Sequence, residues 1–121
     1  MAELIRAPGQ SPMLAGAVVA GDLVYTSGVI DPAVFGAEEP PFAAQAAGAL
    51  SALLAVLADA GTDSAHVVKL EAFLADPADF AAWNAEYLKI WPEPGPARTT
   101  IVVGFAMPAA RIEIQAVAVL P

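Results

Sequence analysis

Cysteine is missing from this chain of 121 residues, and basic residues and histidine are scarce. The lack of cysteine excludes disulfide bonds, a thiolate nucleophile and cysteine-ligated metal. One histidine and scattered acidic residues make a poor ligand set for a metal, so we expect no metal and no cofactor. Five Lys and Arg against thirteen Asp and Glu leave a net charge of −8, with too few cations to neutralise a phosphate backbone. We therefore expect no nucleic-acid partner.

The sequence also lacks a clear membrane or export signal. Its longest apolar stretch, AAQAAGALSALLAVLA, is interrupted by Gln45 and Ser51 and is short for a bilayer. The N-terminal MAELIRAPGQ contains no apolar segment of the signal-peptide type. These observations predict a cytoplasmic protein that does not bind membranes.

Apolar residues, in contrast, are abundant. They make up 58% of the sequence, above the roughly 45–50% of ordinary soluble domains. The length predicts one domain over residues 1–121. Much of the excess is alanine, but Val, Ile and Leu contribute as well. An extra apolar face on so small a domain predicts burial against another copy of the chain.

The chain alternates between strand-like and helix-like patterns. In order, we expect a hairpin around residues 21–22, a helix over residues 42–60, a strand from His66, a helix that Asp76 begins and Pro92 ends, and two C-terminal strands, TTIVVGF and ARIEIQAVAVL. This β-β-α-β-α-β-β order predicts an α+β fold, with a single sheet and two helices on one face. The uncovered and partly apolar second face is another reason to expect an oligomer.

Glu113 lies inside the last predicted strand. Alternation places Ile112 and Ile114 on one side of that strand and Glu113 with Gln115 on the other. Two interpretations stay open. Glu113 could mark the solvated face that antiparallel sheets often have. Alternatively, it could face a cleft, where a carboxylate can hold or deprotonate a water molecule.

Arg98 comes just before the predicted strand TTIVVGF, whereas Ser27 stands at a strand end and is followed by Gly28. Arg98 could grip a small carboxylate through two parallel hydrogen bonds, or form an ordinary surface ion pair. Gly28 could admit a ligand to the backbone beside Ser27, or simply mark a bulge. The sequence has no G-x-S-x-G element, so we do not expect a serine nucleophile.

The segment WNAEYLKIW carries aromatic residues at helical spacing. Trp83, Tyr87 and Trp91 fall at i, i+4 and i+8, which is typical of a stripe that faces the core. Asn84 then lies on a neighbouring face, where it could bind the local backbone. His66 stands alone, and we interpret it as a surface residue rather than a base.

Four motifs in fixed order carry a family resemblance: TSGVI at 26–30, DFAAWNAEY at 79–87, PAR at 96–98 and RIEIQAVAV at 111–119. Through them the sequence resembles the RidA (YjgF) family from about Pro12 to Val119. The resemblance implies a chorismate-mutase-like fold of the Bacillus type and a homotrimer with clefts between its subunits. It also implies hydrolysis of enamines and imines, such as 2-aminoacrylate and 2-iminopropanoate, to 2-keto acids and ammonia.

The resemblance further implies roles for six residues. Arg98 matches the family's carboxylate-binding arginine, and Glu113 the glutamate that positions the attacking water. The positions that match pocket-lining residues are Ser27, Gly28, Asn84 and Thr100. Met13 stands where many members carry tyrosine, Thr100 stands where cysteine is common, and the connector before Arg98 is shorter than usual.

Two other functions stay open beside imine hydrolysis. The same clefts could bind keto acids or similar small carboxylates without turnover, as a sensing module. Some relatives have been proposed to be ribonucleases or translation inhibitors, but the acidity of this chain argues against that function here.

Overall fold

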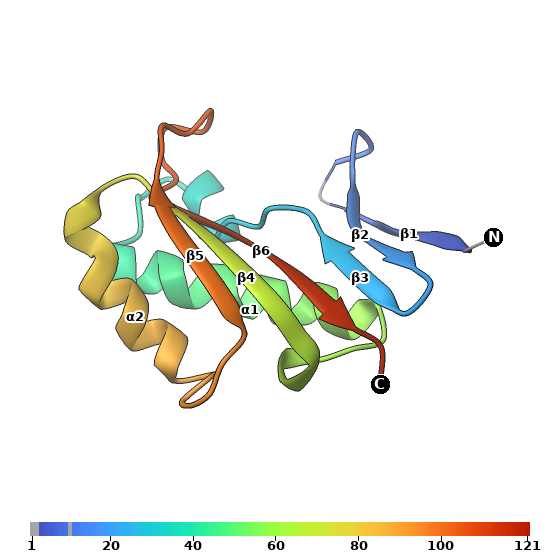
Figure 1. Cartoon of the computed structure of the whole chain (residues 1–121). Coiled ribbons are helices and arrows are strands. Elements are labelled where there is room, and N and C mark those ends of the chain that lie inside the picture. Colours follow the sequence, from blue (N-terminus) through green and yellow to red (C-terminus); the bar gives the residue numbers. More distant parts are fainter. Residues whose placement is uncertain (1–2, 10) are drawn as a thin grey trace.

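One mixed sheet and two helices make up the fold of this computed structural model, which describes residues 3–9 and 11–121. Both helices lie on the same side of the sheet (Figure 1). The elements are β1 (Leu4–Pro8), β2 (Ala15–Ala20), β3 (Leu23–Thr26), α1 (Phe42–Asp59), β4 (Val67–Leu74), α2 (Phe80–Leu88), β5 (Ala97–Val102) and β6 (Ile112–Val119). The predicted α+β class is confirmed, and β1 is an additional strand.

The strand order is β1-β2-β3-β6-β4-β5, so the last strand in the sequence lies in the middle of the sheet. All pairs are antiparallel except β4 with β5, which is parallel. The β2–β3 hairpin turns at residues 21–22 as predicted, and Gly21 adopts a φ of 60° that favours glycine.

The predicted long helix is α1, and it supplies much of the core. Among the described residues, α1 alone is long and apolar enough to cross a bilayer, but Leu50, Leu53 and Leu57 are buried as it packs on the sheet. Gly61, at a φ of 93°, follows its C-terminus, where glycine commonly ends a helix. The Thr62 hydroxyl donates to the Val119 carbonyl at 2.7 Å, which ties this helix end to β6.

The second helix is shorter than predicted. The Asp76 side chain accepts a hydrogen bond from the Ala78 amide at 2.8 Å, as an N-cap does, but the cap opens a 3-10 turn, Pro77–Asp79, that leads into α2. The helix ends at Leu88, before Pro92. The sheet-facing stripe is confirmed, because Trp83, Tyr87 and Trp91 are all buried.

A polar network ties the start of β6 to both helices. The buried Gln45 side chain donates to the carbonyls of Pro40 and Ala109 and accepts the Arg111 amide proton at 2.9 Å. The Arg111 guanidinium forms a bidentate pair with Asp79, at 2.8 and 2.9 Å. This arginine is therefore occupied by an anion of its own chain.

Gly48→Ala should destabilise the protein, although alanine normally favours a helix interior. A Cβ atom at Gly48 would collide with the Asp31 carboxylate, which is buried and accepts a hydrogen bond from the Ala33 amide. We expect a loss of about 1–3 kcal/mol, as for other overpacked sites. Urea unfolding measures it, and the cost should shrink in an Asp31→Ala background. An increase in the free energy of unfolding would contradict this close contact.

Candidate functional site

Glu113 lies on the open face of the sheet, in the central strand β6. Its neighbours Ile112 and Ile114 are fully buried towards the helices, so the alternating Glu113 points to the other side. Phe73 of β4 is its cross-strand partner. The position predicted from alternation is therefore confirmed.

Gly28 packs directly against the Glu113 side chain. A backbone bridge fixes this approach, since Val29 and Ile114 exchange hydrogen bonds of 2.7 and 3.0 Å. A Cβ atom at Gly28 would lie 2.5 Å from Oε2 of Glu113. The missing side chain at Gly28 thus leaves room for close contact with the carboxylate.

Ser27 lies beside Gly28, but its hydroxyl is engaged within the sheet. It donates to the Ala15 carbonyl at 2.6 Å, while its amide donates to the Gly16 carbonyl. Ser27 and Gly28 also line a mainly apolar cavity of about 400 Å³, whose other walls come from the β1–β2 hairpin and α1. The structure therefore places Ser27, Gly28 and Glu113 together.

Arg98 lies on the opposite face of the sheet. It is the second residue of β5, not a residue before the strand as the sequence suggested, and it pairs with the buried Leu70. Its guanidinium carbon lies 4.7 Å from the centroid of the Tyr87 ring and 5.9 Å from that of Phe80. The side chain is therefore held against α2 by aromatic faces.

No carboxylate of the described residues forms an ion pair with Arg98. Arg111, the other partly buried arginine, is in contrast saturated by Asp79. Burial raises the pKa of Tyr87, an effect that the positive charge of Arg98 partly opposes, so the phenol stays neutral at physiological pH. The donors of Arg98 consequently remain available to an external anion.

Thr100 and Asn84 accompany Arg98. Thr100 follows it by two residues on the same face, and its hydroxyl accepts the Trp83 indole proton at 3.3 Å. Asn84 shares a helical face with Phe80 and Tyr87, by the i, i+4, i+7 spacing. Its side-chain oxygen is buried and has no hydrogen-bond donor among the residues that the structure describes. That oxygen can accept a donor from a bound molecule.

One chain therefore presents two half-sites, on opposite faces of the sheet. The first half-site is Ser27, Gly28 and Glu113, and the second is Asn84, Arg98 and Thr100. Strand β4 separates β5 from β6, and Arg98 and Glu113 pair with its residues Leu70 and Phe73. Within one copy, Arg98 and Glu113 cannot act on the same small molecule.

Comparison with known proteins accounts for nearly the whole chain. Residues 5–120 match the protein family described as Endoribonuclease L-PSP. The chain belongs to this family. The predicted RidA resemblance is confirmed with it, because one relative is named Reactive Intermediate Deaminase A and the structural neighbours include a YjgF protein.

Individual relatives show how far the similarity extends. The 3-aminoacrylate deaminase RutC of Acinetobacter baylyi is 36% identical over 121 residues, which cover 96% of each chain. The chloroplastic Reactive Intermediate Deaminase A of Arabidopsis thaliana is 34% identical over 95% of this chain and 63% of its own.

Two solved structures from E. coli share the fold. That of the YjgF gene product has a TM-score of 0.80 and 32% identity, with 94% of this chain and 92% of that one covered. That of TdcF with bound serine has a TM-score of 0.83 and 30% identity, with 100% and 98% covered.

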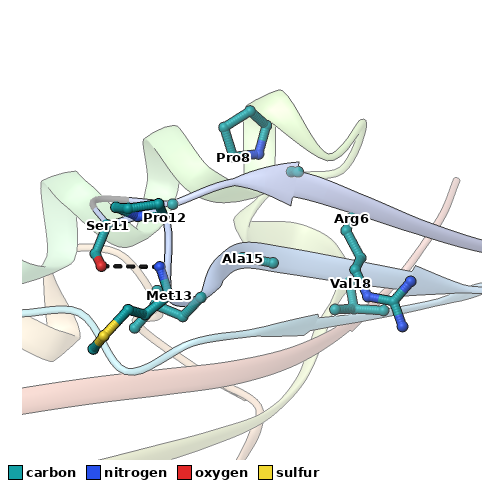
Figure 2. A pocket seen from close by; sticks show the side chains of 10 residues that line it. Arg6, Pro8, Ser11, Pro12, Met13, Ala15 and Val18 are labelled. Carbon is teal, nitrogen blue, oxygen red and sulfur yellow. Dashed lines mark hydrogen bonds between the residues drawn. The ribbon is translucent and has the colours of Figure 1, made fainter.

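A second groove of this RidA-family chain adjoins the cavity that Ser27 and Gly28 line, because Pro8, Gly9 and Leu14 belong to the walls of both. It measures about 640 Å³ and is lined by residues of β1, β2 and the turn between them. Figure 2 shows Arg6 at one end of this groove and Ser11 with Met13 at the other. Met13 is 89% exposed, and Arg6 is the only ionisable residue of the lining. Among the lining residues that the structure describes, Arg6 therefore has no acidic or general-base partner.

Tyr87 and Phe80 are the site neighbours that sequence reasoning missed. The spacing assigned Tyr87 to the core alone and gave Phe80 no role, whereas both rings contact Arg98. Their i, i+7 spacing before a PAR segment is the signal that would have found them. No group of three or more His, Asp or Glu side chains that could hold a metal occurs within residues 3–9 and 11–121.

Proposed function

We propose that this protein hydrolyses reactive enamines and imines to 2-keto acids and ammonia, in clefts that two copies of the chain form together. Arg98 from one copy binds the substrate carboxylate, and Glu113 from the next directs the attacking water. One observation carries the proposal: among the described residues, Arg98 on one face of the sheet has no ion-pair partner, and Glu113 on the other face packs against Gly28. The deaminase names of the relatives support the reaction class.

The chemistry requires only positioning and proton transfer. Water adds to the electrophilic carbon of the protonated imine while Glu113 accepts one of its protons, and a neutral tetrahedral carbinolamine forms. Glu113 returns that proton to the nitrogen, and the C–N bond breaks. The hydroxyl proton passes to the departing ammonia as the carbonyl of the keto acid forms, so that ammonium is released. Arg98 fixes the carboxylate through two charge-assisted hydrogen bonds, so that the imine carbon faces the water.

The preferred substrates are small 2-imino acids such as 2-iminopropanoate and 2-iminobutanoate. A coupled assay tests this: an amino-acid oxidase or dehydratase generates the imine from several amino acids, and keto-acid release is followed with and without this protein. We expect acceleration that disappears in Glu113→Ala. If no imine is hydrolysed faster in the presence of the protein, the proposed function is wrong.

The assembly that we propose is a homotrimer. The open sheet face carries exposed Leu23, Tyr25 and Ile101, as expected for a surface that another copy covers. A closed ring of three copies would give three equivalent clefts. A cytoplasmic location stays a prediction from the sequence.

Mixing two inactive variants tests the shared site. Arg98→Ala and Glu113→Gln should each be inactive alone, but subunits that are unfolded and refolded together should recover activity. In randomly mixed trimers about a quarter of the clefts regain both residues. Co-refolding of each variant with itself is the control. If the mixture stays as inactive as its components, both residues act within one copy or the assignment fails.

Binding of a small carboxylate without turnover is a second candidate function. It is favoured by the similarity to the E. coli TdcF structure, which contains bound serine. Saturable keto-acid binding without any acceleration of imine hydrolysis would support it. A ribonuclease function, which the family's description suggests, has less support because the net charge of −8 opposes the binding of RNA.

A further inference from the structure

Arg98 is held in place by aromatic rings instead of a counter-ion. The Tyr87 ring lies 4.7 Å from the guanidinium carbon, within the range of a cation–π contact. Such a contact uses the flat face of the guanidinium and leaves its in-plane N–H donors free. A carboxylate in the same position would hold Arg98 equally well, but it would compete with the substrate.

The Tyr87 ring is itself wedged into a defined position. It is 8% exposed and packs edge-on against Trp83 and at a tilt against Trp91, with ring centroids 5.8 and 5.1 Å away. The connector between α2 and β5 passes over its hydroxyl at Gly95. A Cβ atom at Gly95 would collide with the Tyr87 hydroxyl and lie 3.1 Å from Cβ of Trp91.

Backbone conformation does not explain glycine at this position. Among the described glycines, only Gly21 and Gly61 have a positive φ. Any L-residue could therefore adopt the Gly95 conformation, and the missing side chain matters because of the space that it leaves. That space is filled by the hydroxyl end of the ring that contacts Arg98.

We propose that Tyr87 and Gly95 are positioning residues for the carboxylate-binding arginine. The Tyr87 ring sets the orientation of the Arg98 guanidinium, and the missing side chain at Gly95 allows the ring to stay in that place. This inference rests on the proposed role of Arg98. It extends the site to the connector that precedes β5.

Four variants test the inference: Tyr87→Phe, Tyr87→Leu, Gly95→Ala and the Gly95→Ala/Tyr87→Phe double variant. The affinity for 2-ketobutyrate is measured by calorimetry, and KM and kcat are measured separately for imine hydrolysis. We expect Tyr87→Leu to raise both Kd and KM about tenfold, as the loss of a desolvated cation–π contact would. Tyr87→Phe keeps the ring and should stay within about twofold of the wild type.

Gly95→Ala should weaken keto-acid binding about as much as Tyr87→Leu, because it displaces the ring. In the double variant the effect should be smaller, since the colliding hydroxyl is gone. Thr62→Val is the stability control. It removes a hydrogen bond remote from Arg98, so the melting temperature should fall while Kd stays unchanged.

Three results would overturn the inference: wild-type affinity in Tyr87→Leu, equal losses in Tyr87→Phe and Tyr87→Leu, or a Gly95→Ala effect that the Phe background leaves unchanged. Wild-type affinity in Arg98→Ala would overturn its premise as well. Failure of the hydrolase function looks different. In that case the wild type binds 2-ketobutyrate without accelerating hydrolysis, and the series of Kd values alone decides the role of Tyr87 and Gly95.

Discussion

Arg98→Ala should lower kcat/KM for 2-imino acids about a thousandfold, which corresponds to about 4 kcal/mol of transition-state stabilisation. The loss is large because Arg98 is the cation that we propose binds the substrate carboxylate, while Arg111 is already committed to Asp79. KM should rise strongly, since the arginine holds the substrate before and during the reaction. Arg98→Lys keeps the charge but loses the planar two-point geometry, so a loss of about ten- to a hundredfold is expected.

Initial rates over a range of imine concentrations measure both Arg98 effects. Arg111→Lys is the matched control, because it changes an arginine that is committed to Asp79. It should lower the melting temperature and leave the kcat/KM of the folded protein near the wild-type value. An Arg98→Ala protein with wild-type kcat/KM would eliminate the carboxylate-binding role.

Glu113→Gln should act on kcat instead of KM. The amide has almost the same shape, so the contact with Gly28 survives, but it cannot accept the proton of the attacking water. Loss of general-base assistance predicts a fall in kcat of about 10²- to 10⁴-fold. KM should change little, because Arg98 still holds the carboxylate. The two variants therefore separate substrate binding from water activation.

Glu71→Gln provides the comparison for Glu113. Glu71 lies on the same open face in the neighbouring strand β4, where it pairs with Gln115. Removing its charge should leave kcat within about twofold of the wild type, because only the groups that transfer the proton carry this effect. If both substitutions reduced kcat equally, the charge of the whole face, and not Glu113 as a base, would explain the loss.

Strong local signals were sufficient for most elements of the fold. Alternation in RIEIQAVAV set the face of Glu113 because Ile112 and Ile114 are unambiguously apolar. The strand β1 escaped prediction since LIRAP combines an arginine and a proline in five residues at a sheet edge. Such a strand depends on its pairing with β2, which a local pattern does not reveal.

The beginning of β4 shows a second limit of local patterns. Strict alternation of the sequence VVKL would place Val67 with Lys69 on one face and Val68 with Leu70 on the other. The register shifts between Val67 and Lys69, so Val67 is buried while Val68 is 45% exposed. A bulge of this kind depends on the pairing with the neighbouring strand, and neither valine indicates it in the sequence.

The most consequential feature that the sequence left undecided is the face of the sheet on which Arg98 lies. The strand TTIVV has no alternation, so nothing local decides whether Arg98 points towards the helices or away from them. Parallel pairing with β4 decides it, and a crossover through α2 is required to bring β5 into place. That Arg98 and Glu113 act together in one site was inferred from the family resemblance, and it stays a proposal until the mixed-variant experiment is done.

The position of the two half-sites in the sheet has a consequence for how activity is lost on mild heating or in dilute urea. Strand β6 has a neighbour on each side, whereas β5 forms the rim of the sheet and pairs only with β4. Amide protons at a rim exchange with solvent through small local openings, while those of a central strand wait for global unfolding. Mild heating or dilute urea should thus weaken substrate binding by Arg98 well before it displaces Glu113. A protein that has lost its substrate affinity in this way would still be folded, and its affinity would return on cooling.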